Sequence, residues 1–196
     1  MEFFTRLGKL LTAAAGVVAV VYGLFGSVLS AMVPPVEDSQ TLLGLVSILS
    51  LVVLLAVSVV LPKVPSRRLQ AAIGVFALVA AVGVAMTYVV HRNNMGTYVY
   101  EYPPSEFPDR KQVRLIAGEL HEPGRKRAEG LLLGYAVQRN GGPDIVNENQ
   151  LLWTQQARLK AEQVLVVGYE VLVGAITTLL FVLGLLAMYR FKNAKG

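Results

Sequence analysis

The chain has 196 residues, of which 54% are hydrophobic and 16% are charged, whereas an average soluble domain carries about 25% charged residues. It contains no cysteine, which excludes disulfides and thiolate chemistry, and its two histidines do not have the spacing of metal ligands. The net charge of +5 gathers at the ends of apolar segments, so it predicts membrane topology and not nucleic-acid binding. We expect neither a cofactor nor a metal.

Four long apolar segments dominate the sequence. They cover residues 10–33, 42–61, 71–90 and 164–189. Each reaches the roughly 20 residues that a helix needs to cross a hydrocarbon core of about 30 Å. The first is too long for the core of a signal peptide, so we expect it to remain as an anchor.

These segments predict an all-α membrane protein with a bundle of four transmembrane helices. Residues 1–90 are expected to hold three spans, and residues 164–196 the fourth span and a basic tail. Residues 91–163 are expected to form a small α+β extramembrane domain, a β-hairpin plus one or two helices, inserted between the third and fourth spans.

Basic residues near the span ends predict the orientation of the chain. With four spans, both tails and the second connection share one side, which holds eight of them: Arg6, Lys9, Lys63, Arg67, Arg68, Arg190, Lys192 and Lys195. The other side holds three within about fifteen residues of the membrane, namely Arg92, Arg158 and Lys160. Because cytoplasmic segments carry the excess of Lys and Arg, we expect both termini in the cytoplasm. Residues 91–163 then lie outside it, at a plasma membrane or a bacterial inner membrane.

A β-hairpin is expected near the start of this domain. Residues 97–102 alternate in polarity, with Tyr98, Tyr100 and Tyr102 on one face, and residues 112–117 alternate again, which predicts two antiparallel strands. An isolated hairpin is marginally stable in water, so we expect it to pack on helices, on a neighbouring subunit or on the bilayer surface. The three tyrosines either contribute to this packing or bind a partner.

Two interpretations compete for residues 123–140. Pro123 at a helix start and Asn140-Gly141-Gly142 at its end predict one helix, whereas Gly130 and Gly134 and a partial alternation favour a strand. We choose the helix.

The fourth span is expected to begin well before its apolar segment. Asp144 or Asn147 can cap a helix whose polar start continues without a Gly or Pro break into that segment. This predicts a helix of about forty residues, roughly 60 Å long at 1.5 Å per residue, that couples the extramembrane domain to a span.

Small residues recur at every fourth position along two spans. They are Ala15, Ala19, Gly23 and Ser27 in the first, and Ala77, Ala81 and Ala85 in the third. The fourth span contains Gly174 and Thr178. Close packing of small residues contributes to helix association in lipid, so these faces either pack within one bundle or form the subunit contacts of a homo-oligomer.

Glu170 is the one acidic residue inside the fourth apolar segment. Counting inward from Arg190 places it near the outer hydrocarbon boundary, level with Thr87, Tyr88 and His91. An ionisable residue at membrane depth marks a pathway, unless it lies at the interface and only forms hydrogen bonds. We therefore take Glu170, Thr87, Tyr88 and His91 as pathway or gating candidates, with Glu170 able to accept a hydrogen bond from Thr87 or Tyr88.

The basic cluster Arg125, Lys126 and Arg127 is either a solvated helix face or a site for anionic head groups or an acidic partner. Together with the three tyrosines of the hairpin it forms the set of partner-binding candidates.

No catalytic residue is predicted, because the sequence has no nucleophile elbow and no Gly-rich phosphate loop. Our leading hypothesis is a non-enzymatic, homo-oligomeric channel, pore or membrane-perturbing effector in the lipid bilayer. A protein or small ligand bound at 91–163 would control it. The alternatives are an accessory or scaffolding subunit that binds a larger protein, and the membrane effector of a bacterial defence cassette with 91–163 as its sensor.

Overall fold

The computed structural model describes residues 30–36, 66–103 and 111–193, and the side chains of these ranges up to residue 186. The chain divides into two compact units. The described residues of the first, the helical unit, are 30–32, 66–89 and 170–193. Those of the second, the hairpin unit, are 33–36, 90–103 and 111–169. Nearly all of the first predicted span and all of the second lie outside the described residues.

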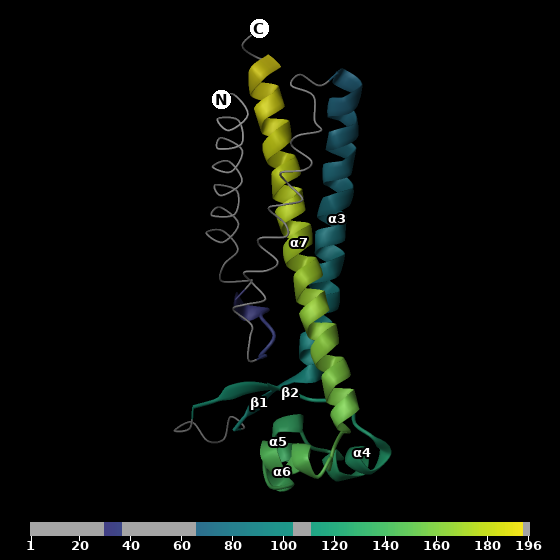
Figure 1. The fold of residues 1–196 in the computed structure, drawn as a ribbon, viewed down its shortest axis with the longest axis vertical. Coiled ribbons are helices and arrows are strands. Elements are labelled where there is room, and N and C mark those ends of the chain that lie inside the picture. Colours follow the sequence, from purple (N-terminus) through teal and green to yellow (C-terminus); the bar gives the residue numbers. More distant parts are fainter. Residues whose placement is uncertain (1–29, 37–65, 104–110, 194–196) are drawn as a thin grey trace, which may run out of the picture. The chain divides into compact units, whose positions relative to one another are not determined.

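The described chain is mostly helical and includes one two-stranded sheet (Figure 1). Two of its helices, α3 (Arg67–Tyr98) and α7 (Gln155–Asn193), have 32 and 39 residues and contribute residues to both units. Both are long and apolar enough to cross a membrane. The predicted spans at 71–90 and 164–189 therefore fall within longer helices.

Helix α3 exposes apolar side chains over most of its circumference. Only 6% of its most apolar stretch is buried, and its exposed side chains include Val75, Phe76, Leu78, Val79, Val82, Met86, Val89 and Val90. Keeping one such side chain in water costs about 1.5 to 3 kcal/mol relative to burying it. Eight of them amount to about 12 to 24 kcal/mol, which is at least as large as the 5 to 15 kcal/mol by which a typical domain is stable, so the surface of α3 is suited to lipid.

The less exposed positions of α3 follow alternating steps of three and four residues, at Ile73, Ala77, Ala80, Val84 and Thr87. The predicted small-residue face behaves differently: Ala77 is buried, but Ala81 and Ala85 are exposed. A strict four-residue step advances about 400° around a helix of 3.6 residues per turn, so such a row drifts off the packed face.

The predicted hairpin is present, in a shorter form. Strands β1 (Val99–Tyr102) and β2 (Val113–Ile116) pair antiparallel, with Val99 opposite Ile116 and Tyr102 opposite Val113. Thr97 and Tyr98, expected in the strand, instead end α3. The ladder continues by one bond, from the Ala117 amide to the Tyr98 carbonyl at 2.7 Å.

The single helix predicted for 123–140 is wrong in one respect, since two helices occupy this segment. Helix α4 (Glu122–Ala128) and α5 (Leu133–Arg139) are separated by a turn in which Gly130 has φ +74°. Glycine adopts this left-handed conformation without a Cβ penalty, so Gly130 ends the helix. The strand alternative is also wrong.

The predicted helix start at Asp144 or Asn147 is wrong as well. The short helix α6 (Pro143–Glu148) begins after Gly142, which has φ +98°, and α7 starts only at Gln155. Between them the chain turns at Gln150, with φ +50°. Thr154 then caps α7, because its hydroxyl accepts a hydrogen bond from the Ala157 amide at 3.1 Å.

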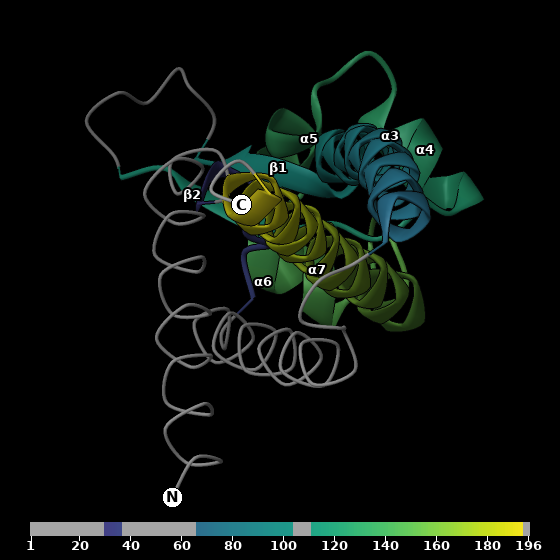
Figure 2. The same ribbon diagram turned by 90° about the horizontal axis from the view of Figure 1, so that it is seen from above.

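The core of the hairpin unit forms where the sheet meets the short helices. Helix α5 lies against β1 and contacts both α4 and α6 (Figures 1 and 2). The buried core residues are Tyr100, Ala117, Ala128, Ala136, Val137, Val146, Leu152 and Trp153. Leu152 and Trp153 belong to the segment between α6 and α7, residues 149–154, which we call the α6–α7 linker.

We predict that Gly124→Ala unfolds the hairpin unit at a lower temperature. A Cβ at Gly124 would overlap the Leu152 carbonyl, so the free energy of unfolding should fall by about 2 kcal/mol or more. Trp153 is the one tryptophan in the chain and is 1% exposed, so its fluorescence reports the transition. The control is Gly96→Ala, where an added Cβ meets nothing within 4 Å. Equal melting temperatures of the two variants would contradict this account of the core.

Candidate functional site

The α6–α7 linker is held on several sides. The Trp153 indole donates a hydrogen bond to Asn147 Oδ1 at 3.0 Å, and its ring lies 6.0 Å from the Tyr100 ring at 54°. Gly118 allows β2 to approach this region, because a Cβ there would come within 2.9 Å of Trp153 Cβ and 2.8 Å of the Arg158 amide. The linker that leads into α7 is therefore built into the core of the hairpin unit.

His121 joins α4 to the same linker. Its Nδ1 accepts a hydrogen bond from the Gly124 amide at 2.8 Å, which leaves the proton on Nε2 for the Gln150 carbonyl, also at 2.8 Å. The His121 amide donates to the Leu152 carbonyl at 3.2 Å. One side chain thus caps α4 and fixes the linker at its left-handed residue.

A pocket of about 280 Å³ opens beside the linker, and we call it the linker pocket. It is lined by Asn147, Glu148, Gln150, Trp153, Gln155 and Arg158. All of these residues belong to the hairpin unit. The side chains of these lining residues comprise three carboxamides, one carboxylate, one guanidinium and one indole.

The guanidinium of Arg158 is the positive charge of this pocket. Its side chain is half-buried. Burial raises the pKa of the nearby Tyr100 because it disfavours the phenolate, and the positive charge of Arg158 opposes this shift. Within the described ranges, Arg158 forms no ion pair. A half-buried cation without a carboxylate partner attracts anionic groups.

Two of the partner-binding tyrosines have accessible surface. Tyr98 and Tyr102 are half-buried, whereas Tyr100 is 6% exposed and lies in the core. Packing therefore accounts for Tyr100, which has almost no surface to offer a partner.

The basic cluster is exposed but is also tied to the fold. Arg125 donates to the Leu120 carbonyl at 3.1 Å and lies 3.7 Å from Glu119, and Lys126 lies 3.6 Å from Glu122. Arg127 donates to the Leu151 carbonyl at 3.1 Å and so connects α4 to the linker. These contacts give Arg125 and Arg127 a structural role at the surface.

Of the pathway candidates, His91 is enclosed where α3 and α7 meet inside the hairpin unit. It is 1% exposed, and its ring lies 5.9 Å from that of Tyr169. Gly168 makes the approach possible, since a Cβ there would stand 2.9 Å from His91 Nδ1.

The other pathway candidates belong to the helical unit. The Thr87 hydroxyl donates to carbonyls of its own helix, Gly83 and Val84, both at 3.0 Å. It therefore does not donate to Glu170, and in the described part of the chain no hydrogen bond or ion pair joins Glu170 to Thr87 or Tyr88. Glu170 and Tyr88 are both half-buried.

The small residues of α7 do not mark its closest contact. A Cβ at Gly174 would meet nothing within 4 Å, and the Thr178 hydroxyl donates to the Gly174 carbonyl at 2.8 Å. The expected face at Ala15, Ala19, Gly23 and Ser27 lies outside the described residues.

Comparison with protein-family models, with curated proteins and with solved structures yields no match. In the described ranges, no group of three His, Cys, Asp or Glu side chains could hold a metal ion.

Sequence reasoning missed Thr154, Trp153 and Gly168. A threonine four residues before Arg158, at the polar end of a helical segment, is a usual capping signal, and it could have located the start of α7. The enclosure of His91 by Gly168 joins residues 77 positions apart, and no local pattern indicates it.

We predict that Gly168→Ala destabilises the protein by about 1 to 3 kcal/mol, because the enclosed His91 ring cannot move aside without cost. The matched control is Gly174→Ala on the same helix, where the added methyl meets open space. Thermal unfolding in detergent measures both. His91→Ala combined with Gly168→Ala should restore part of the loss, and full additivity of the two changes would contradict direct contact.

Proposed function

We propose that the chain is a polytopic membrane protein that forms a homo-oligomeric channel, pore or membrane-perturbing effector controlled by its 91–163 domain. The observation that carries this proposal is the course of α7. The linker that leads into α7 lies in the core of the hairpin unit, Gln155 and Arg158 of α7 line the linker pocket, and the same helix continues through a stretch apolar enough to cross a membrane. A ligand at the pocket would act directly on a spanning helix.

The proposal of four spans is supported by the chain segments that make up the hairpin unit. Residues 33–36 of the first connection belong to that unit, where Pro34 is fully buried and Arg114 donates to the Val33 carbonyl at 3.5 Å. The proposal places the first connection and the 91–163 domain on one side of the membrane, and it assigns the crossing that leads to α3 to the apolar segment 42–61 of the sequence.

Buried hydroxyls on α7 support its placement in lipid. Thr177 is 5% exposed and donates to the Val173 carbonyl at 2.8 Å, and Thr178 bonds its own helix in the same way. A polar group in hydrocarbon needs such an internal partner. The distribution of Lys and Arg supports cytoplasmic termini and a 91–163 domain outside the cytoplasm, at a plasma or bacterial inner membrane.

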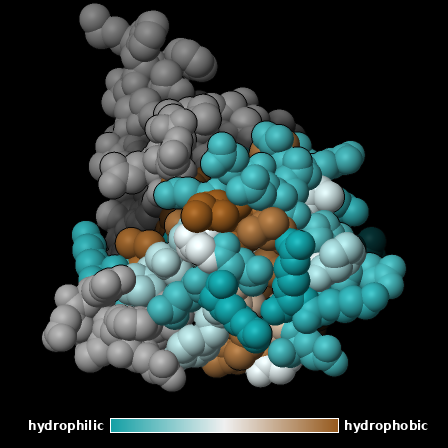
Figure 3. All heavy atoms as spheres, turned by 90° about the horizontal axis from the view of Figure 1, so that it is seen from below, coloured by the Kyte–Doolittle hydropathy of each residue, from teal (hydrophilic) through white to brown (hydrophobic). Residues whose placement is uncertain are grey.

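An accessory or scaffolding subunit is the second candidate, favoured by apolar side chains on the hairpin unit. Leu132 is 76% exposed and Ile145 is 46% exposed. On the face drawn in Figure 3, hydrophobic residues are exposed between largely hydrophilic ones. Such residues can form the centre of a protein interface.

We predict that purified protein in liposomes makes them leaky to a trapped fluorescent dye and that stiffness of α7 controls the leak. Val167 and Val171 are 55% and 50% exposed on either side of the boundary between the two units. Replacing both with glycine keeps the helix register and removes stiffness, so the leak rate should change severalfold. Replacing both with alanine is the matched control and should leave the rate at the wild-type value.

Equal rates for the glycine and alanine pairs would show that α7 does not transmit a signal. Tight liposomes containing a monomeric wild-type protein would refute the channel proposal and put the accessory subunit first.

A further inference from the structure

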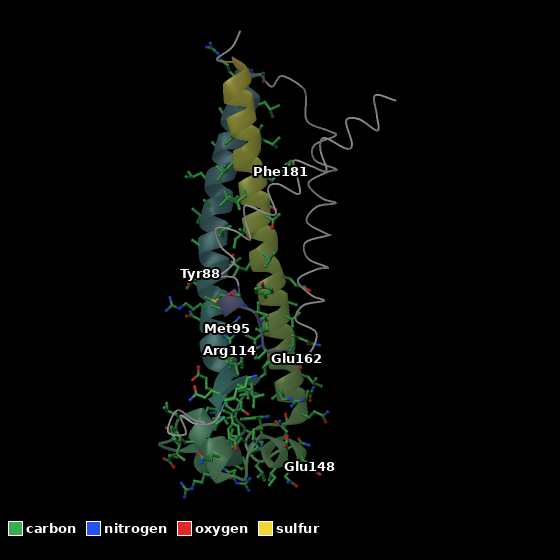
Figure 4. All side chains as sticks on the ribbon, turned by 90° about the vertical axis from the view of Figure 1, so that its left-hand side faces the viewer. Tyr88, Met95, Arg114, Glu148, Glu162 and Phe181 are labelled. Atoms are coloured by element: carbon green, nitrogen blue, oxygen red, sulfur yellow. The ribbon has the colours of Figure 1, made fainter. Side chains whose placement is uncertain are left out.

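We propose that the linker pocket binds a small zwitterion, with Arg158 receiving its anionic group and Glu148 its cationic group. This inference names the ligand class of the 91–163 domain and so rests on the function proposed above. Both residues line the same pocket, one from α7 and the other from the end of α6. Figure 4 shows Glu148 at the surface of the hairpin unit.

The two charges do not neutralise each other. No ion pair joins Glu148 to Arg158, and within the described residues neither has another ion-pair partner. A ligand with charges of both signs can bridge them. A simple anion would meet the repulsion of Glu148, and a simple cation that of Arg158, so the pocket selects against both.

Hydrogen-bonding groups surround this charge pair. The Trp153 indole donates a hydrogen bond to Asn147 Oδ1, and the amide nitrogen of Asn147 is the donor group of this lining residue. Gln150 and Gln155 add carboxamides that donate and accept. His121 fixes the Gln150 backbone through the 2.8 Å bond to its carbonyl, so this wall of the pocket is formed before a ligand arrives.

The size of the pocket restricts the ligand. A volume of about 280 Å³ lies just below the roughly 300 to 1,000 Å³ of sites for drug-sized molecules. A free α-amino acid has a carboxylate for Arg158 and an ammonium for Glu148. A phosphoethanolamine or phosphocholine head group has the same pair of charges, with phosphate as the anion. The shared chemistry is an oxyanion joined by a short linker to a cationic nitrogen.

The test is calorimetric titration of the purified full chain in detergent. The probes are single amino acids, glycerophosphoethanolamine and glycerophosphocholine, with acetate, inorganic phosphate and ethylamine as singly charged controls. Arg158→Gln should weaken zwitterion binding about tenfold or more, because it removes a charge-assisted bidentate contact. Glu148→Gln should weaken it about threefold, since its carboxylate is exposed.

Two matched variants make the same charge changes outside the pocket. They are Lys160→Gln on α7 and Glu129→Gln after α4, both exposed, and both should bind as the wild type does. If Arg158→Gln lowers the melting temperature that Trp153 fluorescence reports, Arg158→Lys is used in its place. Lysine keeps the positive charge but lacks the planar, bidentate guanidinium.

Binding of an amino acid that falls in the pocket variants alone supports a free metabolite as the ligand. The same pattern with a glycerophosphodiester supports a lipid head group. The inference is overturned if no zwitterion binds at millimolar concentration, if acetate or phosphate binds equally well, or if pocket and control variants lose the same affinity. The titration needs no leak activity, so failure of the liposome experiment with intact binding would refute the channel proposal alone.

Discussion

The apolar circumference of α3 is the constraint on which the rest of the structure depends. A helix that leaves Val, Leu, Phe and Met side chains exposed on several faces is stable only where the surroundings are as apolar as those side chains. The connection that follows α3 is instead rich in polar groups and folds around a core of its own. In the proposed placement one chain meets both lipid and water, and α3 and α7 each contribute residues to both units.

The α6–α7 linker connects the core of the hairpin unit to the long helix α7. The chain turns at Gln150 between α6 and α7, and Leu152 and Trp153, which follow the turn, lie in the core. His121 and Thr154 satisfy the backbone groups that the interruption leaves exposed. The break also brings Glu148 and Arg158 to one pocket, so stability and the proposed binding site have the same physical origin.

The local pattern of the sequence predicted the hairpin, the two apolar helices α3 and α7 of the described residues and the approximate length of α7, because these depend on periodicity over a few turns. It did not predict the breaks at Gly130 and Gln150. Helix propensity alone tolerates Gln150, and the contact that holds its left-handed backbone is a tertiary one, the hydrogen bond from His121 to its carbonyl. The enclosure of His91 by Gly168 and the pocket between α6 and α7 depend on contacts between distant residues. Periodicity carries no information about such contacts.

Single-cysteine labelling in intact cells tests most directly whether α3 crosses the membrane and separates its two ends. The chain has no native cysteine, and Ser66 precedes α3 while Leu132 is 76% exposed on the hairpin unit. The account predicts that an impermeant thiol reagent labels Leu132→Cys in intact cells, and labels Ser66→Cys only after the membrane is permeabilised. Equal labelling of both positions in intact cells would contradict it.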